Sequence, residues 1–395
     1  MPGWWSRLSR NAKWLVVTEP GWSIPMPWVF FYLPVYLSAL GVGEVEYGVY
    51  LSIARGLSVA APALVVPIAV RMGFKRAFLA VDTLANVGFL LLLLSGSREL
   101  AALSVALSAL FSVSGPLWEV LLVEGTRAEA LVPVYSALTA MYIVGSLLTP
   151  IAGHLMSSLG SLEGFRLVSL VALAAFVAKT LVLAVTLEEP GAPRAEAEVG
   201  VAGGLRETLK AASSRAVRAV LAYTALSSTL YAVSSYLSLY LCDPRAVGMT
   251  AEEAGFVQML SSAVSLALLT AFTAGSTVAR ARHLAVTAAA GVVAYVLFAL
   301  SEAQPSLAYV AAAVLGVKGL EYSFSRAVFL RALKGSSALA RGHAFSLLYA
   351  LSNLVTVPAP LLVGMLYSVQ PMLIWVLAAA ASAAQLALSS LASRD

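Results

Sequence analysis

Apolar runs of about 20 residues recur along the whole chain, and this repetition limits the possible folds more than any other feature. A run of that length forms a helix that crosses roughly 30 Å of hydrocarbon and satisfies its own backbone hydrogen bonds. The runs predict an all-α integral membrane protein with twelve transmembrane helices, at residues 14–40, 47–70, 77–96, 100–122, 132–158, 165–187, 217–242, 253–274, 284–301, 306–330, 343–367 and 371–392.

The composition agrees with a protein whose solvent is the bilayer. Of the 395 residues, 60% are hydrophobic and 11% are charged, and the mean hydropathy is +0.87. Soluble proteins carry about 25% charged residues, so a soluble enzyme is excluded. A single cysteine and three histidines leave little for disulfides or metal sites, and we expect no metal and no cofactor. The first run contains Glu19 and four prolines, which is unlike a cleaved signal peptide.

The distribution of Lys and Arg predicts the orientation in the membrane. With the N-terminus in the cytoplasm, 18 of the 25 basic residues lie in cytoplasmic segments and 3 lie on the opposite side. Both termini are therefore expected to be cytoplasmic, in a multi-pass protein of the cell membrane. Because the basic residues report topology, the net charge of +5 does not indicate a nucleic-acid partner. The other four basic residues fall inside expected spans, namely Arg55, Lys179, Lys318 and Arg326.

The chain is expected to consist of two six-helix bundles that are related by an internal repeat. The stretch Tyr32-Leu-Pro-Val-Tyr-Leu-Ser38 matches Tyr236-Leu-Ser-Leu-Tyr-Leu-Cys242 at an offset of 204 residues, and Pro150 and Pro358 are 208 apart. A polar stretch separates the halves. We expect an N-terminal bundle at 1–187, a cytoplasmic linker at 188–212 and a C-terminal bundle at 213–395.

The loop after the second expected span reads Pro67-Ile-Ala-Val70-Arg71-Met-Gly73-Phe-Lys75-Arg76. Together with the two halves, it resembles the signature G-x-x-x-D-R-x-G-R-[RK] of the major facilitator superfamily of secondary transporters. The Arg, the Gly and the basic pair are kept, whereas Pro67 and Val70 replace the first Gly and the Asp. The resemblance covers essentially the whole chain and implies the fold of that family, with a substrate path between parallel repeats.

In that family this loop helps to govern alternating access. The resemblance therefore implies a gating or helix-packing role for Arg71, Gly73, Lys75 and Arg76. Glu124, near the cytoplasmic end of the fourth expected span, can pair with Arg71 or Arg76 in place of the missing Asp.

A second family-like pattern lies in the fifth expected span, where Gly145, Pro150 and Gly153 fall in GSLLTPIAGH. It resembles the motif G-x-x-x-G-P-x-x-G-G of exporters that exchange a substrate for protons, with Thr149 and His154 in place of two glycines. The physical alternative is that small residues and a proline let this helix bend and pack closely against a neighbour.

Ionisable side chains inside the spans are the best site candidates, because each costs at least about 2.5–3.5 kcal/mol near mid-bilayer. In the resembled family the first, fourth, seventh and tenth spans line the cavity, and those spans carry most of the polar stripes here. The candidates for binding substrate or protons are Glu19, Glu119, Ser227, Tyr231, Lys318, Glu321 and Arg326. Glu119 and Arg326 are hypothesised to face each other, because the repeat offset places Glu119 next to Arg326.

Structural roles are the alternative for several of these residues. Glu19 can lie at the headgroup level, and Lys318 and Glu321, three residues apart, can form a local neutralising pair. For Lys179 we favour a structural role, in which it snorkels or locks neighbouring helices. Asp82 is assigned to the cytoplasmic helix interface.

The function predicted from these features is secondary active transport by alternating access, through proton-coupled export of a small organic or drug-like molecule. The alternative is an uptake carrier or uniporter for a polar solute such as a sugar, an amino acid or an organic anion. A membrane enzyme acting on lipids is a distant alternative, and no enzymatic activity is expected. The expected partners are a small-molecule substrate, protons and the lipid bilayer, and the protein is expected to be a monomer.

Overall fold

The computed structural model describes residues 4–189, 215–274, 281–321, 324–325, 328–329 and 354–392. Every regular element in these residues is helical, as the apolar runs predict. The chain divides into two compact units, the first made of Met1–Pro193 with Thr250–Gly255 and the second of Arg194–Met249 with Phe256–Asp395. Of the expected linker at 188–212, only Glu188 and Glu189 lie among the described residues.

In unit 1 most of the expected spans are divided into shorter consecutive helices. In chain order these are η1 (Trp4–Arg7), α1 (Arg10–Thr18), α2 (Pro20–Ser23), α3 (Met26–Ala39), α4 (Glu44–Ala60), η2 (Ala61–Leu64), α5 (Val65–Met72), α6 (Phe74–Thr83), the π-helical turn η3 (Leu84–Gly88), α7 (Phe89–Leu94), α8 (Arg98–Leu107), η4 (Ser108–Leu110), α9 (Phe111–Val123), α10 (Ala128–Leu147), α11 (Thr149–Leu159) and α12 (Ser161–Thr186).

Prolines account for the breaks in the first and fifth expected spans. Pro20 opens α2, Pro25 is the N-cap of α3, and Pro150 lies in the first turn of α11. A proline lacks the backbone N–H that a helix interior needs, but its fixed φ suits a first helical turn. The breaks leave polar backbone groups inside the bundle, so the side chains beside them are expected to be polar.

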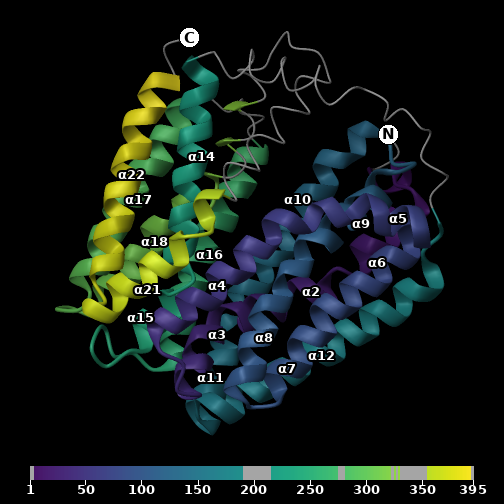
Figure 1. Cartoon of the computed structure of the whole chain (residues 1–395). Helices are drawn as coiled ribbons and strands as arrows, with labels where there is room; N and C mark the ends of the chain where they lie inside the picture. The colour runs from purple at the N-terminus through teal and green to yellow at the C-terminus, as the bar shows by residue number, and fades with distance from the viewer. Residues whose placement is uncertain are drawn as a thin grey trace. The chain divides into compact units, whose positions relative to one another are not determined.

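Unit 2 contains fewer breaks in its described part. Its helices are α14 (Arg215–Ser234), α15 (Leu237–Cys242), α16 (Ala251–Ala274, of which the residues up to Gly255 belong to unit 1), α17 (Ala281–Leu300), α18 (Leu307–Lys318), α21 (Ala359–Val369) and α22 (Leu373–Ala392). Helices α14, α17 and α22 run side by side, with α18 against α17 (Figure 1). Across the described residues of both units, seven helices are long and apolar enough to cross a membrane. The count of twelve therefore stays a prediction.

The internal repeat reappears as the same hydrogen bond in each unit. The hydroxyl of Tyr36 donates to the carbonyl of Leu93 at 2.5 Å, and that of Tyr240 donates to the carbonyl of Phe298 at 2.7 Å. The two donors are 204 residues apart and the two acceptors are 205 apart. Both tyrosines are fully buried. A buried hydroxyl needs such a partner, so the repeated sequence reflects a repeated packing solution.

The loop after α15 is held by a carboxylate. Asp243 accepts hydrogen bonds from the backbone N–H of Arg245 at 2.8 Å, from its guanidinium at 2.8 Å, and from the buried hydroxyl of Tyr367 in α21 at 3.1 Å. Burial raises the pKa of Asp243, but the hydrogen bonds and the positive charge of Arg245 outweigh it, so the pKa lies below its usual value. This carboxylate therefore joins the end of α15 to α21 while it is ionised.

Asp243→Asn is expected to lower the unfolding midpoint of the detergent-purified protein at pH 7. Because the folded pKa is depressed, this stabilisation is present above the unfolded pKa of about 3.9 and is lost as the pH falls through the folded value. The difference from wild type should therefore shrink on acidification below about pH 4. Thermal unfolding as a function of pH measures it, with the exposed Glu129→Gln as the matched control. A difference that stays constant at every pH would contradict this role.

Gly145 lets α10 approach the break between α2 and α3. A Cβ atom on this residue would overlap the carbonyl oxygen of Ser23 and would lie 2.8 Å from Cα of Ile24. We expect Gly145→Ala to destabilise the protein by about 1–3 kcal/mol, the usual cost of overpacking. Gly115→Ala in α9 is the matched control, because nothing lies within 4 Å of its added Cβ. Equal thermal unfolding midpoints for the two variants would refute the close approach.

Candidate functional site

A buried polar cluster lies in unit 2 and contains three of the residues predicted from the sequence. We define the C-terminal cluster by four residues. These are Ser227 of α14, Lys318 at the end of α18, Glu321 three residues later, and Gln385 of α22. Lys318 Nζ lies 2.5 Å from the Glu321 carboxylate and 2.9 Å from Gln385 Oε1. Gln385 Nε2 donates to Glu321 at 2.8 Å and to the Ser227 hydroxyl oxygen at 2.8 Å, and Ser227 also donates to Glu321.

The cluster is neutral and its hydrogen bonds connect three helices. Lys318 and Glu321 form the pair expected from their spacing of three residues, but both are also bonded to side chains of other helices. Lys318 is 9% exposed, Glu321 8% and Gln385 0%, so the charges are compensated inside the bundle. Gly291 in α17 leaves room for the lysine, because a Cβ there would lie 3.2 Å from Lys318 Cδ.

A hydrogen-bonding stripe runs along α14 from this cluster to the surface of the structure. Tyr223 is buried and its hydroxyl lies 3.2 Å from Thr287 Oγ1. Ser227, one turn later, is half-buried, and Tyr231, one further turn along, is 61% exposed. The predicted residues Ser227 and Tyr231 therefore lie on one face of α14 with graded exposure.

Unit 1 contains a second polar cluster. We define the N-terminal cluster as Glu19, Ser23, Asp82, Asn86 and Lys179. Glu19 lies at the break between α1 and α2, where its carboxylate accepts from Lys179 Nζ at 3.1 Å and from the Ser23 hydroxyl at 2.8 Å. Glu19 and Lys179 are 8% and 7% exposed, which places Glu19 inside the bundle rather than at its surface.

Asp82 and Asn86 complete the N-terminal cluster on α6 and the π-helical turn. Asn86 Nδ2 donates to Asp82 Oδ1 at 3.1 Å, and Trp22 Nε1 donates to Asn86 Oδ1 at 2.9 Å. The charges of Lys179 and Glu19 both act on the Asp82 carboxylate. A π-helical turn in a helix is frequently found at functional sites, and this one places Asn86 between Trp22 and Asp82.

The two clusters occupy equivalent positions in the repeat. Lys179 and Gln385 are 206 residues apart, Asp82 and Thr287 are 205 apart, and Ser114 and Glu321 are 207 apart. These offsets match those of the repeated tyrosines. Sequence reasoning missed Gln385, Asp82 and Lys179 as site residues, although applying the repeat offset to polar residues inside the spans would have connected them.

The hypothesised pair of Glu119 and Arg326 is not tested by the structure. Glu119 is exposed on α9, and Arg326 lies outside the described residues. That these two side chains face each other therefore stays a prediction.

The signature-like loop is joined to the end of the sixth expected span by a carboxylate that the sequence did not suggest. Glu189 accepts hydrogen bonds from the backbone N–H groups of Phe74 and Lys75, and Lys75 Nζ donates to the carbonyl of Leu187 at 2.6 Å. These N–H groups belong to the first turn of α6, and the positive end of the helix dipole also stabilises a carboxylate there. Gly73 precedes them with φ +82°, a conformation suited to glycine.

The other predicted loop residues lie at the surface. Arg71, Arg76 and Glu124 are exposed, and within the described ranges Glu124 forms no ion pair with either arginine. Glu189, rather than Glu124, is the carboxylate that contacts this loop. The neighbouring Glu188 binds α1. Its carboxylate lies 2.5 Å from the Arg10 guanidinium, and its backbone N–H and carbonyl both form hydrogen bonds with the Asn11 side chain.

The segment with Gly145, Pro150 and Gly153 bends where α10 ends and α11 begins. Trp28 Nε1 donates to the carbonyl of Gly145 at 2.7 Å, so the small residue brings α10 against the first span. Gly153 is buried in α11, where a Cβ would lie 2.5 Å from the hydroxyl of Tyr32. The geometry agrees with the packing and bending role that was the physical alternative for this motif.

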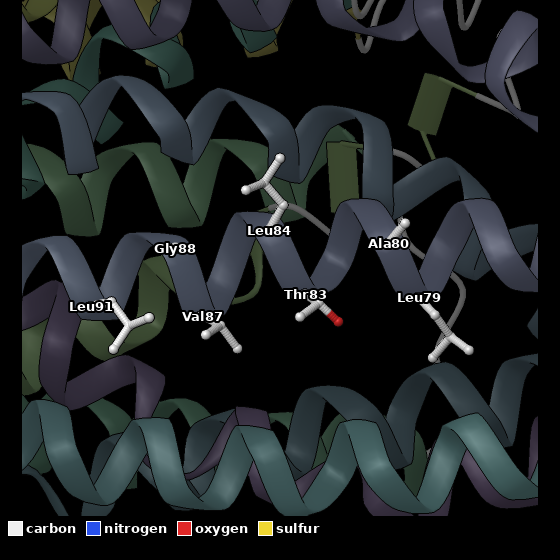
Figure 2. A pocket seen from close by; sticks show the side chains of 7 residues that line it. All are labelled: Leu79, Ala80, Thr83, Leu84, Val87, Gly88 and Leu91. Carbon is white, nitrogen blue, oxygen red and sulfur yellow. The ribbon is translucent and has the colours of Figure 1, made fainter.

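A shallow groove on α6, η3 and α7 is apolar. It is lined by Leu79, Ala80, Thr83, Leu84, Val87, Gly88 and Leu91 (Figure 2). Leu79, Thr83, Val87 and Leu91 point to the same side in Figure 2. One hydroxyl is its only side-chain polar group, so the groove offers little to orient a polar solute. Among the described residues, no group of three or more His, Cys, Asp or Glu side chains can hold a metal ion.

Solved structures share this fold. A single-residue mutant of the nucleoside transporter NupG superposes with a TM-score of 0.73 at 14% identity, over 97% of this chain and 100% of the other. A bacterial homologue of the iron transporter ferroportin, in an inward-facing state, gives 0.63 at 18% identity, over 98% and 99%. A bacterial metal transporter gives 0.64 at 19% identity, over 98% of each chain.

No curated protein matches the sequence. The family model described as Major Facilitator Superfamily matches residues 21–329, which is well over half of the chain. The match includes the signature-like loop and most of both polar clusters. The chain is therefore a membrane transporter that belongs to the major facilitator superfamily.

Proposed function

We propose that this protein is a secondary active transporter that exports a small organic molecule in exchange for protons, by alternating access. The observation that carries the proposal is the C-terminal cluster, in which the charged Lys318 and Glu321 and the polar Gln385 are buried within an apolar bundle, beside the half-buried Ser227. Buried ion pairs add little stability compared with well-packed apolar residues of similar volume. Their presence therefore supports a binding role.

The cluster can recognise a substrate because its partners are exchangeable. A polar group of the substrate can take the place of Gln385 as a hydrogen-bond donor to Glu321. It can also take the place of Ser227 as the acceptor from Gln385, and neither exchange leaves a charge unpaired. Removing a partner with no replacement costs about 3–5 kcal/mol, so an empty site favours the internally paired arrangement. A ligand that prefers the rearranged cluster shifts the conformational equilibrium, which is the requirement for alternating access.

Export is proposed from the segment of Gly145, Pro150 and Gly153, which resembles the motif of proton-exchanging exporters. Gly145 lies against the α2–α3 break at Ser23, and the Ser23 hydroxyl donates to Glu19 of the buried ion pair. We further propose that the protein acts as a monomer in the cell membrane, with both termini in the cytoplasm, and that it catalyses no covalent reaction.

An uptake carrier for a polar solute is the second candidate. It is favoured by the neutral amide and hydroxyl groups of Gln385, Ser227 and Tyr223, which suit hydroxyl-rich or amide-bearing molecules. A transporter of this fold carries nucleosides, so nucleosides belong among the sugars, amino acids and organic anions to be tested.

A thermal-shift screen of the purified protein identifies ligands, because a compound that binds the folded state raises the unfolding midpoint. We expect Gln385→Leu and Ser227→Ala to weaken binding of a hit about tenfold each, which corresponds to about 1.4 kcal/mol. Ser368→Ala, an exposed hydroxyl in α21, is the matched control and should bind as wild type does. Unchanged affinity in both cluster variants would exclude this cluster as the substrate site.

Transport in proteoliposomes then separates the two candidates. An exporter should move the hit against its gradient when a proton gradient runs the opposite way, and proton entry should accompany it. Hits confined to sugars, nucleosides or carboxylates, with proton-independent counterflow, would instead establish the polar-solute carrier.

A further inference from the structure

We propose that the coupling proton binds in the N-terminal cluster, on Asp82, and that Lys179 is shared between Asp82 and Glu19. This inference rests on the proposed proton-coupled function, and it names the site of the proton. The cluster holds two carboxylates, those of Glu19 and Asp82, and one buried lysine. One lysine neutralises one carboxylate, so the cluster carries a surplus negative charge unless a proton is bound.

The geometry assigns the surplus to Asp82. Glu19 takes the lysine at 3.1 Å and the Ser23 hydroxyl at 2.8 Å. Asp82 receives the amide of Asn86 at 3.1 Å, which is a neutral donor. A carboxylate that lacks its own cation inside a bundle is expensive, and protonation removes that cost.

The groups that act on Asp82 come from every neighbouring element. Around its carboxylate lie Lys179 of α12, Glu19 at the α1–α2 break, Ser114 of α9 and Asn86 of the π-helical turn. From α5, packed against α6, Arg71 lies in the exposed last turn. Whether Asp82 holds a proton therefore depends on which of the two carboxylates is paired with Lys179.

The repeat provides an internal comparison. At the positions equivalent to Asp82 and Lys179, the C-terminal half has Thr287 and Gln385, which do not titrate near neutral pH. In the C-terminal cluster, one lysine faces one carboxylate, so its charges cancel. Of the two clusters that the described residues form, only the N-terminal one has a carboxylate in excess, which separates a proton site from a neutral substrate site.

A hydrogen-bond chain links Asp82 to α2. Asp82 bonds to Asn86, and Asn86 bonds to Trp22 of α2 at 2.9 Å. The Trp22 ring lies 6.1 Å from the ring of Tyr142 in α10, the helix that carries Gly145. When the proton leaves the Asp82 oxygen, the carboxylate becomes able to attract Lys179 away from Glu19. The same event alters the hydrogen bonds at the break between α1 and α2.

Infrared spectroscopy of the full-length protein tests the site without a substrate. A protonated carboxyl group in the membrane gives a C=O stretching band that disappears as the pH is raised. We expect this band in wild type, its loss in Asp82→Asn, and its retention in Glu163→Gln, which removes an exposed carboxylate paired with Arg166. A titrating band that persists in Asp82→Asn, or no band in wild type, would overturn the proposal.

Two further variants should shift the titration in opposite directions. In a Glu19→Gln background, where Glu19 cannot contribute a band, Lys179→Met removes the remaining cation, so the band should persist to a pH about 1–3 units higher than in Glu19→Gln alone. Glu19→Gln frees Lys179 for Asp82, so the band should disappear at a pH lower by a similar amount. If the cluster had only a structural role, both variants would have a lower unfolding midpoint, and the pH at which the band disappears would not shift in opposite directions. Asp82→Glu, which keeps a titratable group, should retain the band if Asp82→Asn fails to fold.

Transport separates failure of this inference from failure of the proposed function. Proton-driven exchange that survives in Asp82→Asn would reject this site and leave the proton-coupled function standing. A titrating Asp82 in a protein whose transport ignores the proton gradient would reject the proton-coupled function. Loss of proton dependence in Asp82→Asn, with substrate counterflow retained, is the result that we expect.

Discussion

A charge inside an apolar helical bundle must be compensated within the bundle, and this constraint organises much of the structure. Lys179 and Lys318 each lie beside a buried carboxylate, and each pair is held further by neutral hydrogen-bonding side chains. The helices that supply these side chains cannot shift independently, because a shift would leave a charge uncompensated. Helix positions and the compensation of buried charge are therefore coupled by electrostatics.

The helix breaks in unit 1 serve the same constraint. Glu19 lies where α1 gives way to α2, and Asn86 lies in the π-helical turn between α6 and α7. Such breaks are tolerated at membrane depth where they are buried in protein or line a cavity. A polar cluster beside irregular backbone can reorganise at a lower cost than one held on continuous helices, because fewer backbone hydrogen bonds change.

The sequence predicts the parts of this molecule that depend on local pattern. Apolar runs predict the helical fold, and the repeated tyrosine-containing stretch predicts the internal repeat, within which the same hydrogen bond recurs in both units. The spacing of Lys318 and Glu321 predicts their pairing. Gln385 and Glu189 were missed because their roles depend on which helices pack together, and a single sequence does not contain that information. Lys179 was assigned a structural role because its partner is 160 residues away.

The two clusters indicate how one repeated framework can serve two purposes. The positions of Lys179 and Asp82 are occupied by Gln385 and Thr287 in the second half, so exchanging charged for neutral side chains changes the chemistry while the helix packing is kept. If both halves carried a carboxylate in excess of their lysines, both would bind protons. Such a symmetric molecule would discriminate poorly between proton and substrate. Under the proposed function, confining the surplus to one half would let the protonation state bias one bundle, while the neutral cluster of the other would respond to polar ligands.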